Sequence, residues 1–205
     1  MQLSKIPAVG ALALLGLVFS GVPKADAAYI VTVQQVGANV VASGSGSLDL
    51  TDLSLYGPGS GSPYFPLFDP SFAMIVGSYD VNMDEYHGPI VGPTSFGSGN
   101  VGYSTLSGSG PIVGIAFSAE YIDVPTGYTS GTLLGTSSDT WDNWTLAALG
   151  ATPGTYTWTW GSGAHADSFT LNIESPVPEP ASFALLGTAV AALGLSWRRK
   201  MGHTG

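Results

Sequence analysis

Residues 155–174 read TYTWTWGSGAHADSFTLNIE, and polar and large apolar side chains alternate strictly at both ends of this stretch. Side chains on a strand point to its two faces in turn, so Tyr156, Trp158 and Trp160 share one face. The returning strand carries three apolar residues on one face: Phe169, Leu171 and Ile173. Residues 161–163, Gly-Ser-Gly, supply the turn. The pattern predicts a β-hairpin that packs Trp158 and Trp160 into a core.

The remainder of residues 28–175 consists of short β-branched and apolar runs separated by glycine, serine and proline. Such runs are typical of short strands joined by turns. Strands are expected at 29–36, 40–50, 74–81, 112–119 and 131–135, a helical turn at 145–149, and loops at 55–72 and 88–110, the second with weak strand pieces at Phe96 and Tyr103. We therefore predict one all-β domain, a single β-sandwich, with a jelly roll as the alternative.

The segment before the hairpin, from Leu149 to Tyr156, resembles the corner that enters a late strand of fibronectin-like sandwiches. In that corner a tyrosine hydroxyl bonds to the backbone a few residues earlier in the chain. The resemblance implies this role for the hydroxyl of Tyr156.

The charges of the chain are distributed very unevenly. The sequence has 14 acidic and 5 basic residues, and all of the Lys and Arg side chains lie in the terminal segments. All of the acids except Asp26 and Glu179 lie within residues 28–175, and this region contains no Lys or Arg. A surface without cations excludes nucleic acid and anionic lipid as partners of this region. The chain has no cysteine, so disulfides do not stabilise it.

Residues 1–27 have the pattern of a secretory signal peptide. Lys5 gives the positive start, residues 8–21 are apolar, and Ala25 and Ala27 flank Asp26 as a small-x-small cleavage site. Cleavage there places the mature N-terminus at Ala28.

The other end of the chain combines an extended segment, an apolar segment and a basic segment. Residues 176–180 read PVPEP, and alternate prolines keep such a segment extended. Residues 181–197 carry no charge, and as a helix they would span about 26 Å. Arg198, Arg199 and Lys200 follow directly. We predict a short transmembrane helix at 181–197 with a basic stop at 198–200 on the cytoplasmic side.

Residues 176–201 resemble the PEP-CTERM sorting signal, whose signature is matched by Val177, Pro178, Glu179 and Pro180. The resemblance implies that an exosortase-type transpeptidase in the inner membrane recognises Pro178-Glu179-Pro180 and cleaves near it. It further implies a precursor anchored in the inner membrane of a Gram-negative bacterium. The processed protein would then reside at the cell surface or in the extracellular polysaccharide matrix of a biofilm.

One acidic cluster has the character of a metal site. On a strand, Asp80, Asn82 and Asp84 would share a face and offer the oxygen ligands that Ca²⁺ prefers. The spacing fails as a helix–loop–helix calcium loop, because Glu85 and Val91 replace the required glycine and glutamate. Calcium binding and an acidic solvated turn are the two interpretations; no other cofactor is expected.

No catalytic motif is present in the sequence. It lacks a Gly-x-Ser-x-Gly elbow, a His-Glu-x-x-His motif and cysteine. His87 and His165 are expected to be solvated loop residues. We expect a non-enzymatic structural or interaction role.

The alternative role is carbohydrate binding, with or without Ca²⁺. Sugar rings stack well on indole faces, and four tryptophans lie close together in the sequence: Trp141, Trp144, Trp158 and Trp160. A surface hydrolase is the third and least supported reading, because it would need a pair of carboxylates in one cleft.

Overall fold

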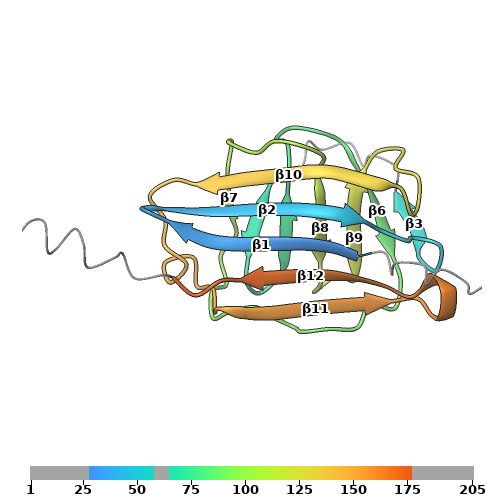
Figure 1. The fold of residues 1–205 in the computed structure, drawn as a ribbon. Coiled ribbons are helices and arrows are strands. Elements are labelled where there is room, and N and C mark those ends of the chain that lie inside the picture. The colour runs from blue at the N-terminus through green and yellow to red at the C-terminus, as the bar shows by residue number, and fades with distance from the viewer. Residues whose placement is uncertain (1–27, 58–64, 177–205) are drawn as a thin grey trace, which may run out of the picture.

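The computed structural model describes residues 28–57 and 65–176, and its regular structure there is almost entirely β (Figure 1). The strands are β1 (Ala28–Val36), β2 (Asn39–Ser47), β3 (Ser54–Gly57), β4 (Leu67–Asp69), β5 (Ala73–Val76), β6 (Met83–His87), β7 (Tyr103–Ser104), β8 (Val113–Ala116), β9 (Tyr121–Pro125), β10 (Leu133–Trp141), β11 (Gly154–Trp160) and β12 (Asp167–Ile173). A 3₁₀ turn, η1 (Gly163–His165), lies between the last two strands. The all-β prediction is confirmed.

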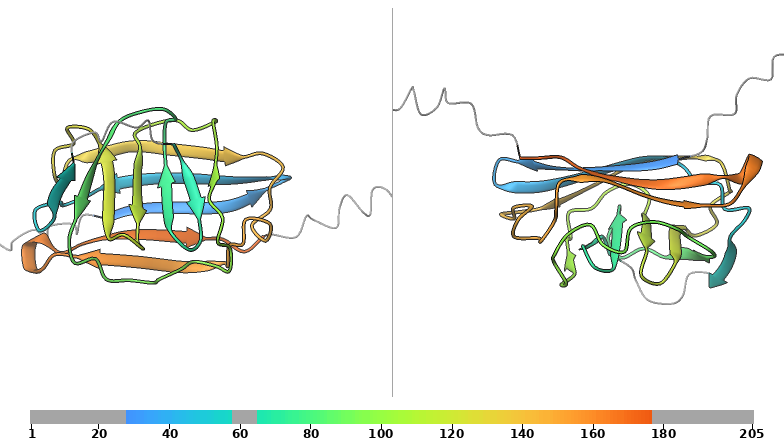
Figure 2. Two further views of the ribbon diagram at one scale, coloured as in Figure 1. Left: turned by 180° about the vertical axis from the view of Figure 1, so that it is seen from behind. Right: turned by 90° about the horizontal axis from the view of Figure 1, so that it is seen from below.

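The strands form two sheets. The first sheet has five strands in the order β10-β2-β1-β12-β11, and the second has seven in the order β3-β6-β9-β8-β5-β4-β7. Figure 1 shows the strands of the first sheet running across those of the second, and the edge-on view in Figure 2 shows two separate layers. The two sheets thus lie against each other with their strands crossed.

The first and last described strands are neighbours in the centre of the first sheet. β1 and β12 pair in parallel, with Ala28 opposite Ser168 and Val33 opposite Ile173. Because the two strands run in the same direction, the described chain enters at one end of this sheet and leaves at the other (Figure 2). The predicted signal-cleavage site and the predicted sorting signal therefore adjoin opposite ends of the domain.

The main core lies between the sheets and is rich in aromatic side chains. Trp158 and Trp160 of β11 are almost completely buried in it, as predicted. Each indole N–H reaches a backbone carbonyl, Trp158 that of Pro93 at 2.8 Å and Trp160 that of Asp49 at 2.8 Å. Burying these rings therefore leaves no donor unpaired, which is the condition under which tryptophan is favourable in a core.

The corner before β11 forms the predicted hydrogen bond. The hydroxyl of Tyr156 donates to the carbonyl of Thr152 at 2.9 Å. The preceding turn is closed by a hydrogen bond from the Leu149 N–H to the Thr145 carbonyl at 3.0 Å, in agreement with the helical turn expected at 145–149. These two bonds direct the chain into β11.

Several strands differ from those expected. The strand expected at 74–81 ends at Val76, because Gly77 adopts a φ of +125° and a Cβ there would lie 2.2 Å from the Pro111 carbonyl. The expected loop 55–72 contains most of β3 and all of β4. β6 and β9 were not expected, because an acid in the middle of each interrupts the apolar pattern: Glu85 in β6 and Asp123 in β9. Both acids lie on the outer face of the second sheet.

The predicted signal peptide, residues 1–27, and the predicted transmembrane helix at 181–197 lie outside the described residues. Within the described residues, the structure contains no helix of sufficient length and hydrophobicity to cross a membrane.

The hydroxyl of Tyr29 begins a buried chain of hydrogen bonds, and removing this hydroxyl measures how much the chain stabilises the fold. Its hydroxyl donates to the Ser137 hydroxyl at 2.9 Å, and Ser137 donates to the Pro111 carbonyl at 2.6 Å. Tyr29→Phe should lower the free energy of unfolding by about 1 kcal/mol, because the ring stays packed while the buried oxygen of Ser137 loses its donor. Urea unfolding followed by tryptophan fluorescence measures this change. Tyr103→Phe is the control, and an equal loss in both variants would contradict the argument.

Candidate functional site

An apolar pocket lies on the outer face of the second sheet. Its volume is about 250 Å³, and its walls are mainly aliphatic and aromatic. β4 to β9 all contribute to it, together with the residues flanking β4 and following β8. Two carboxylates, Glu85 and Asp123, are the acidic groups that line it.

Strand alternation explains why these two acids meet. On β9, Ile122 and Val124 face the core between the sheets, so Tyr121 and Asp123 face outward. β6 pairs with β9 in a register that places Glu85 directly opposite Asp123. Such directly opposed side chains have Cβ atoms about 5 Å apart. The register thus brings two like charges onto neighbouring strands at one pocket.

Asp123 is the more buried of the two acids, with 1% of its surface exposed. Its Oδ2 atom has no hydrogen-bond partner. Burial, and secondly the charge of Glu85, raise the pKa of Asp123 to about 7. A carboxylic acid that titrates near neutral pH beside a pocket is a typical feature of functional sites, although structural positions also produce it.

A second buried acid, Asp139 on β10, lies away from this pocket. Its Oδ2 accepts a hydrogen bond from the N–H of Gly77 at 2.7 Å, while Oδ1 has no partner. Burial raises its pKa to about 7, opposed by the hydrogen bond from Gly77. Asp139 is therefore as buried as Asp123 and has a similarly raised pKa, but it does not line the pocket.

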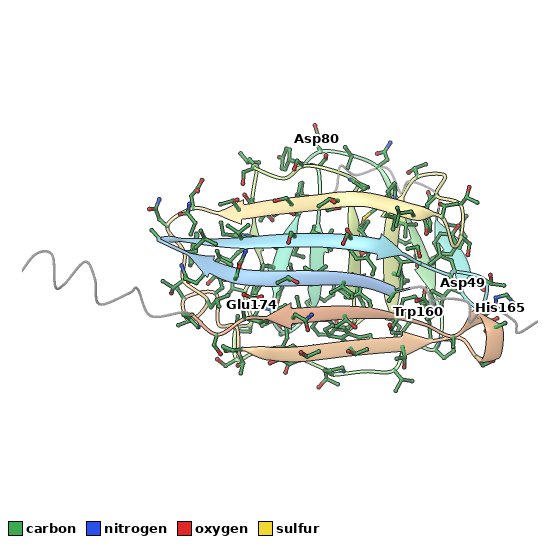
Figure 3. The ribbon with its side chains drawn as sticks, viewed as in Figure 1. Asp49, Asp80, Trp160, His165 and Glu174 are labelled. Atoms are coloured by element: carbon green, nitrogen blue, oxygen red, sulfur yellow. The ribbon has the colours of Figure 1, made fainter. Side chains whose placement is uncertain are left out.

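A third acid, Asp49, lies in the segment after β2, at one end of the first sheet, and connects this segment to the last hairpin. Figure 3 shows Asp49, Trp160 and His165 together at this end. One oxygen of Asp49 accepts from the N–H and hydroxyl of Thr51 and from the hydroxyl of Ser130, and the other lies 3.1 Å from Nδ1 of His165. These hydrogen bonds, that of the Thr51 hydroxyl above all, hold the pKa of Asp49 well below its usual range.

The arrangement at Asp49 does not match a serine–histidine–aspartate relay. In a relay the serine hydroxyl bonds to the histidine, which removes its proton. Here Ser130 donates to Asp49, and so the hydroxyl is directed to the acid. His165 is half exposed at this position, and its contact with Asp49 connects η1 to the rest of the domain. The geometry indicates a structural role for this cluster.

The three residues of the predicted calcium site do not lie on one strand. Asp80 lies in an exposed bend with a φ of 60°, at the periphery of the domain in Figure 3. Asn82 precedes β6, and Asp84 within β6 is buried and accepts a hydrogen bond from the Gly127 N–H at 2.9 Å. The early end of β5 at Gly77 causes this difference. No group of three His, Cys, Asp or Glu side chains suited to a metal occurs in the described residues.

The tryptophans do not form an exposed platform for sugars. Trp141, Trp158 and Trp160 belong to the core between the sheets. Trp144 is partly buried and packs on Tyr103 with ring centroids 4.5 Å apart. Trp144 is thus the one member of the four with a substantial exposed surface.

The predicted sorting signal begins immediately beyond the last strand. β12 ends at Ile173, and the N–H of Glu174 donates to the Val33 carbonyl at 2.8 Å. Figure 3 shows Glu174 at the end of the sheet opposite Asp49 and His165. Val177, Pro178, Glu179, Pro180 and the basic stop lie outside the described residues, as do Ala25 and Ala27.

Comparison with known proteins identifies the C-terminal segment. Residues 176–200 match the family model of the PEP-CTERM protein-sorting motif, as the residue pattern predicted. No curated protein and no solved structure matches the chain. The motif implies recognition by exosortase and export, through a membrane-anchored precursor, to the cell surface.

The two buried acids predict an unusual dependence of stability on pH. The pKa values of Asp123 and Asp139 are about 7 in the folded protein, compared with 3.8 for an unperturbed aspartate. The folded state therefore binds more protons than the unfolded state between these values, and the free energy of unfolding should fall as the pH rises from 4 to 7. The loss should be complete above the folded pKa and reach at most about 4 kcal/mol for each acid.

Asp123→Asn and Asp139→Asn should each reduce this loss, and the double variant should nearly remove it. Urea unfolding at pH 4, 6 and 8 measures the effect. At pH 8 both single variants should be more stable than the wild type, and at pH 4 they should resemble it. A wild-type stability that rises over this range would contradict the argument.

Proposed function

We propose that this chain, which carries a PEP-CTERM sorting motif at residues 176–200, is an exosortase substrate whose β-domain acts at the cell surface or in the extracellular matrix. The domain would be a β-sandwich with crossed sheets and a structural or interaction role without catalysis. A signal peptide at residues 1–27 would direct its export and be cleaved between Ala27 and Ala28, and a membrane helix at 181–197 would hold the precursor.

The observation that carries this proposal is the position of the motif relative to the last strand. The last backbone hydrogen bond that ties the C-terminal end of β12 to β1 is that of Glu174 to Val33. The motif begins two residues later, at Pro176, and Pro176 is exposed to solvent. A cleavage near Pro178-Glu179-Pro180 would therefore remove the anchor and leave every strand of the domain in place.

The non-catalytic part of the proposal is supported by the acidic groups described above. Ser130 donates to one oxygen of Asp49 and His165 lies against the other, so the two side chains are directed to the acid. The pair Glu85 and Asp123 lies in a pocket with mainly apolar walls, which offers few groups to bind the hydroxyls of a sugar. A hydrolase acting on glycans would need such groups to orient its substrate.

Carbohydrate binding is the second candidate function. It is favoured by a shallow depression near Trp144, which is lined by several hydroxyl-bearing side chains and Asp142. The hydroxyls of Thr105 and Ser107 lie 2.9 Å apart, and each also lies 2.7 Å from the Thr140 carbonyl oxygen, so polar groups are concentrated at this depression. Glycan arrays with and without a chelator would distinguish this function, and any calcium requirement, from a purely structural role.

Glu179 is expected to govern processing. Glu179→Ala should leave membrane insertion intact, since residues 181–200 are unchanged, and should cause uncleaved, anchored protein to accumulate in cells that contain the sorting enzyme. Mass spectrometry of the C-terminus of the mature protein measures the outcome. Glu174→Ala is the matched control, because it removes an exposed acid just before the motif. Normal processing of Glu179→Ala would refute the sorting assignment.

The cationic stop is expected to fix the orientation of the precursor. Apolar residues contribute only about −0.3 to −0.6 kcal/mol each to insertion, so a span of 17 residues needs its basic end to hold it. Replacing Arg198, Arg199 and Lys200 by Gln should release full-length protein beyond the inner membrane. In spheroplasts, added protease should digest the wild-type domain and spare a tag placed after Gly205. Digestion of the tag with survival of the domain would contradict this orientation.

A further inference from the structure

The buried oxygen of Asp123 is the starting point of a further inference. Buried polar atoms in native proteins almost always have a partner, and each exception requires an explanation. Asp123 lines the pocket on the outer face of the second sheet, is 1% exposed and has an unpaired Oδ2. A ligand that enters the pocket can supply the missing partner.

The surroundings of Asp123 explain why the chain does not supply that partner. Glu85 lies opposite it on β6, and Gly114 lies opposite it on β8. A Cβ at Gly114 would come within 2.6 Å of the Ile75 side chain, so Ile75 fills the space over Gly114, and it lines the same pocket as Asp123. Residues 28–175 contain no Lys or Arg, and of their two histidines His165 contacts Asp49 while His87 packs against Tyr121 outside the pocket lining. The acid is therefore enclosed by one like charge and by apolar groups.

We propose that this pocket binds a small primary amine, as its ammonium ion, with the charged group on Asp123 and Glu85 and an alkyl or aromatic body against the apolar wall. The wall includes Phe65, Phe72 and Met83. Aromatic faces also attract ammonium groups. The volume of about 250 Å³ lies below the roughly 300–1,000 Å³ of sites for drug-sized ligands, so the ligand must be small.

Other ligand classes fit this pocket less well. A fatty acid would bring a third carboxylate to Glu85 and Asp123. Calcium requires six to eight oxygen ligands, and besides the two acids the pocket offers only the side-chain oxygens of Ser104 and Tyr121. A sugar would leave most of its hydroxyls against the apolar wall without partners. A single ammonium group would offset the negative charge of the carboxylates, and the alkyl or aromatic body of the amine would cover the apolar wall.

The proposal predicts that affinity increases with pH near neutrality. Asp123 must be ionised to pair with an ammonium ion, and its pKa of about 7 means that raising the pH from 6 to 8 ionises it. The other titratable groups that face this region are Glu85 on β6, Tyr121 on β9, and His87 and Tyr56 next to Tyr121. The pKa of Tyr121 is raised from its usual value by desolvation and by Tyr56, so it stays neutral in this range.

Calorimetric titration of the full chain with hexylammonium tests the proposal, with 1-hexanol and hexanoate as neutral and anionic controls of the same length. Hexylammonium should bind saturably and at least about tenfold more tightly at pH 8 than 1-hexanol or hexanoate. Its affinity should fall several-fold on lowering the pH to 6. His87→Gln should show the same pH dependence as the wild type. This result would exclude His87 as its source and leave Asp123.

Two pairs of variants separate binding from general effects on the fold. Asp123→Asn should weaken hexylammonium binding at least about tenfold and abolish the pH dependence, while Asp139→Asn, an equally buried acid outside the pocket, should bind within twofold of the wild type. Glu85→Gln should weaken binding to a smaller extent, and circular dichroism would verify that each variant folds. Equal binding by wild type and Asp123→Asn, equal binding of 1-hexanol, or no saturable binding of hexylammonium would each overturn the proposal.

Discussion

The domain between the two terminal segments must accommodate twelve acids without a single Lys or Arg, because only Asp26 and Glu179 of the 14 lie outside it. A buried carboxylate is costly unless hydrogen bonds or opposite charges compensate it. Backbone N–H groups and hydroxyls perform this role at Asp49, Asp84 and Asp139. Asp123 differs from these because apolar side chains and Glu85 surround it. Burial without an opposite charge therefore accounts for the raised pKa values of Asp123 and Asp139.

The pairing of β1 with β12 connects this domain to its export. These strands are the first and last of the described chain, and they form the centre of the first sheet. The first sheet can therefore close only when the chain has been synthesised through Glu174. The sorting motif at 176–200 begins two residues after Glu174. The parallel register places the start of β1 and the end of β12 at opposite ends of the first sheet.

The candidate pocket was far less predictable from the sequence than the hairpin or the sorting motif. β6 and β9 carry Glu85 and Asp123 at positions where an apolar residue would have indicated a strand, and so both strands escaped prediction. The like-charged pair depends on the register of β6 with β9, which joins residues almost forty positions apart. Periodicity reports which side chains share a face of one strand, and it contains no information on which strand lies beside it.

Strict alternation in residues 155–174 was enough to predict the last hairpin and the burial of Trp158 and Trp160. The resemblance of residues 149–156 to a fibronectin-like corner implied the hydrogen bond of Tyr156. The motif at 176–200 is likewise local and was identified from its residues. The end of β5 at Gly77, which separates Asp80 from Asp84, results from the close approach of the Pro111 carbonyl. The unpaired oxygen of Asp123 results from Ile75 and Glu85 on other strands. Long-range packing sets the solvation of a side chain, and the solvation of Asp123 is what makes the pocket a candidate site.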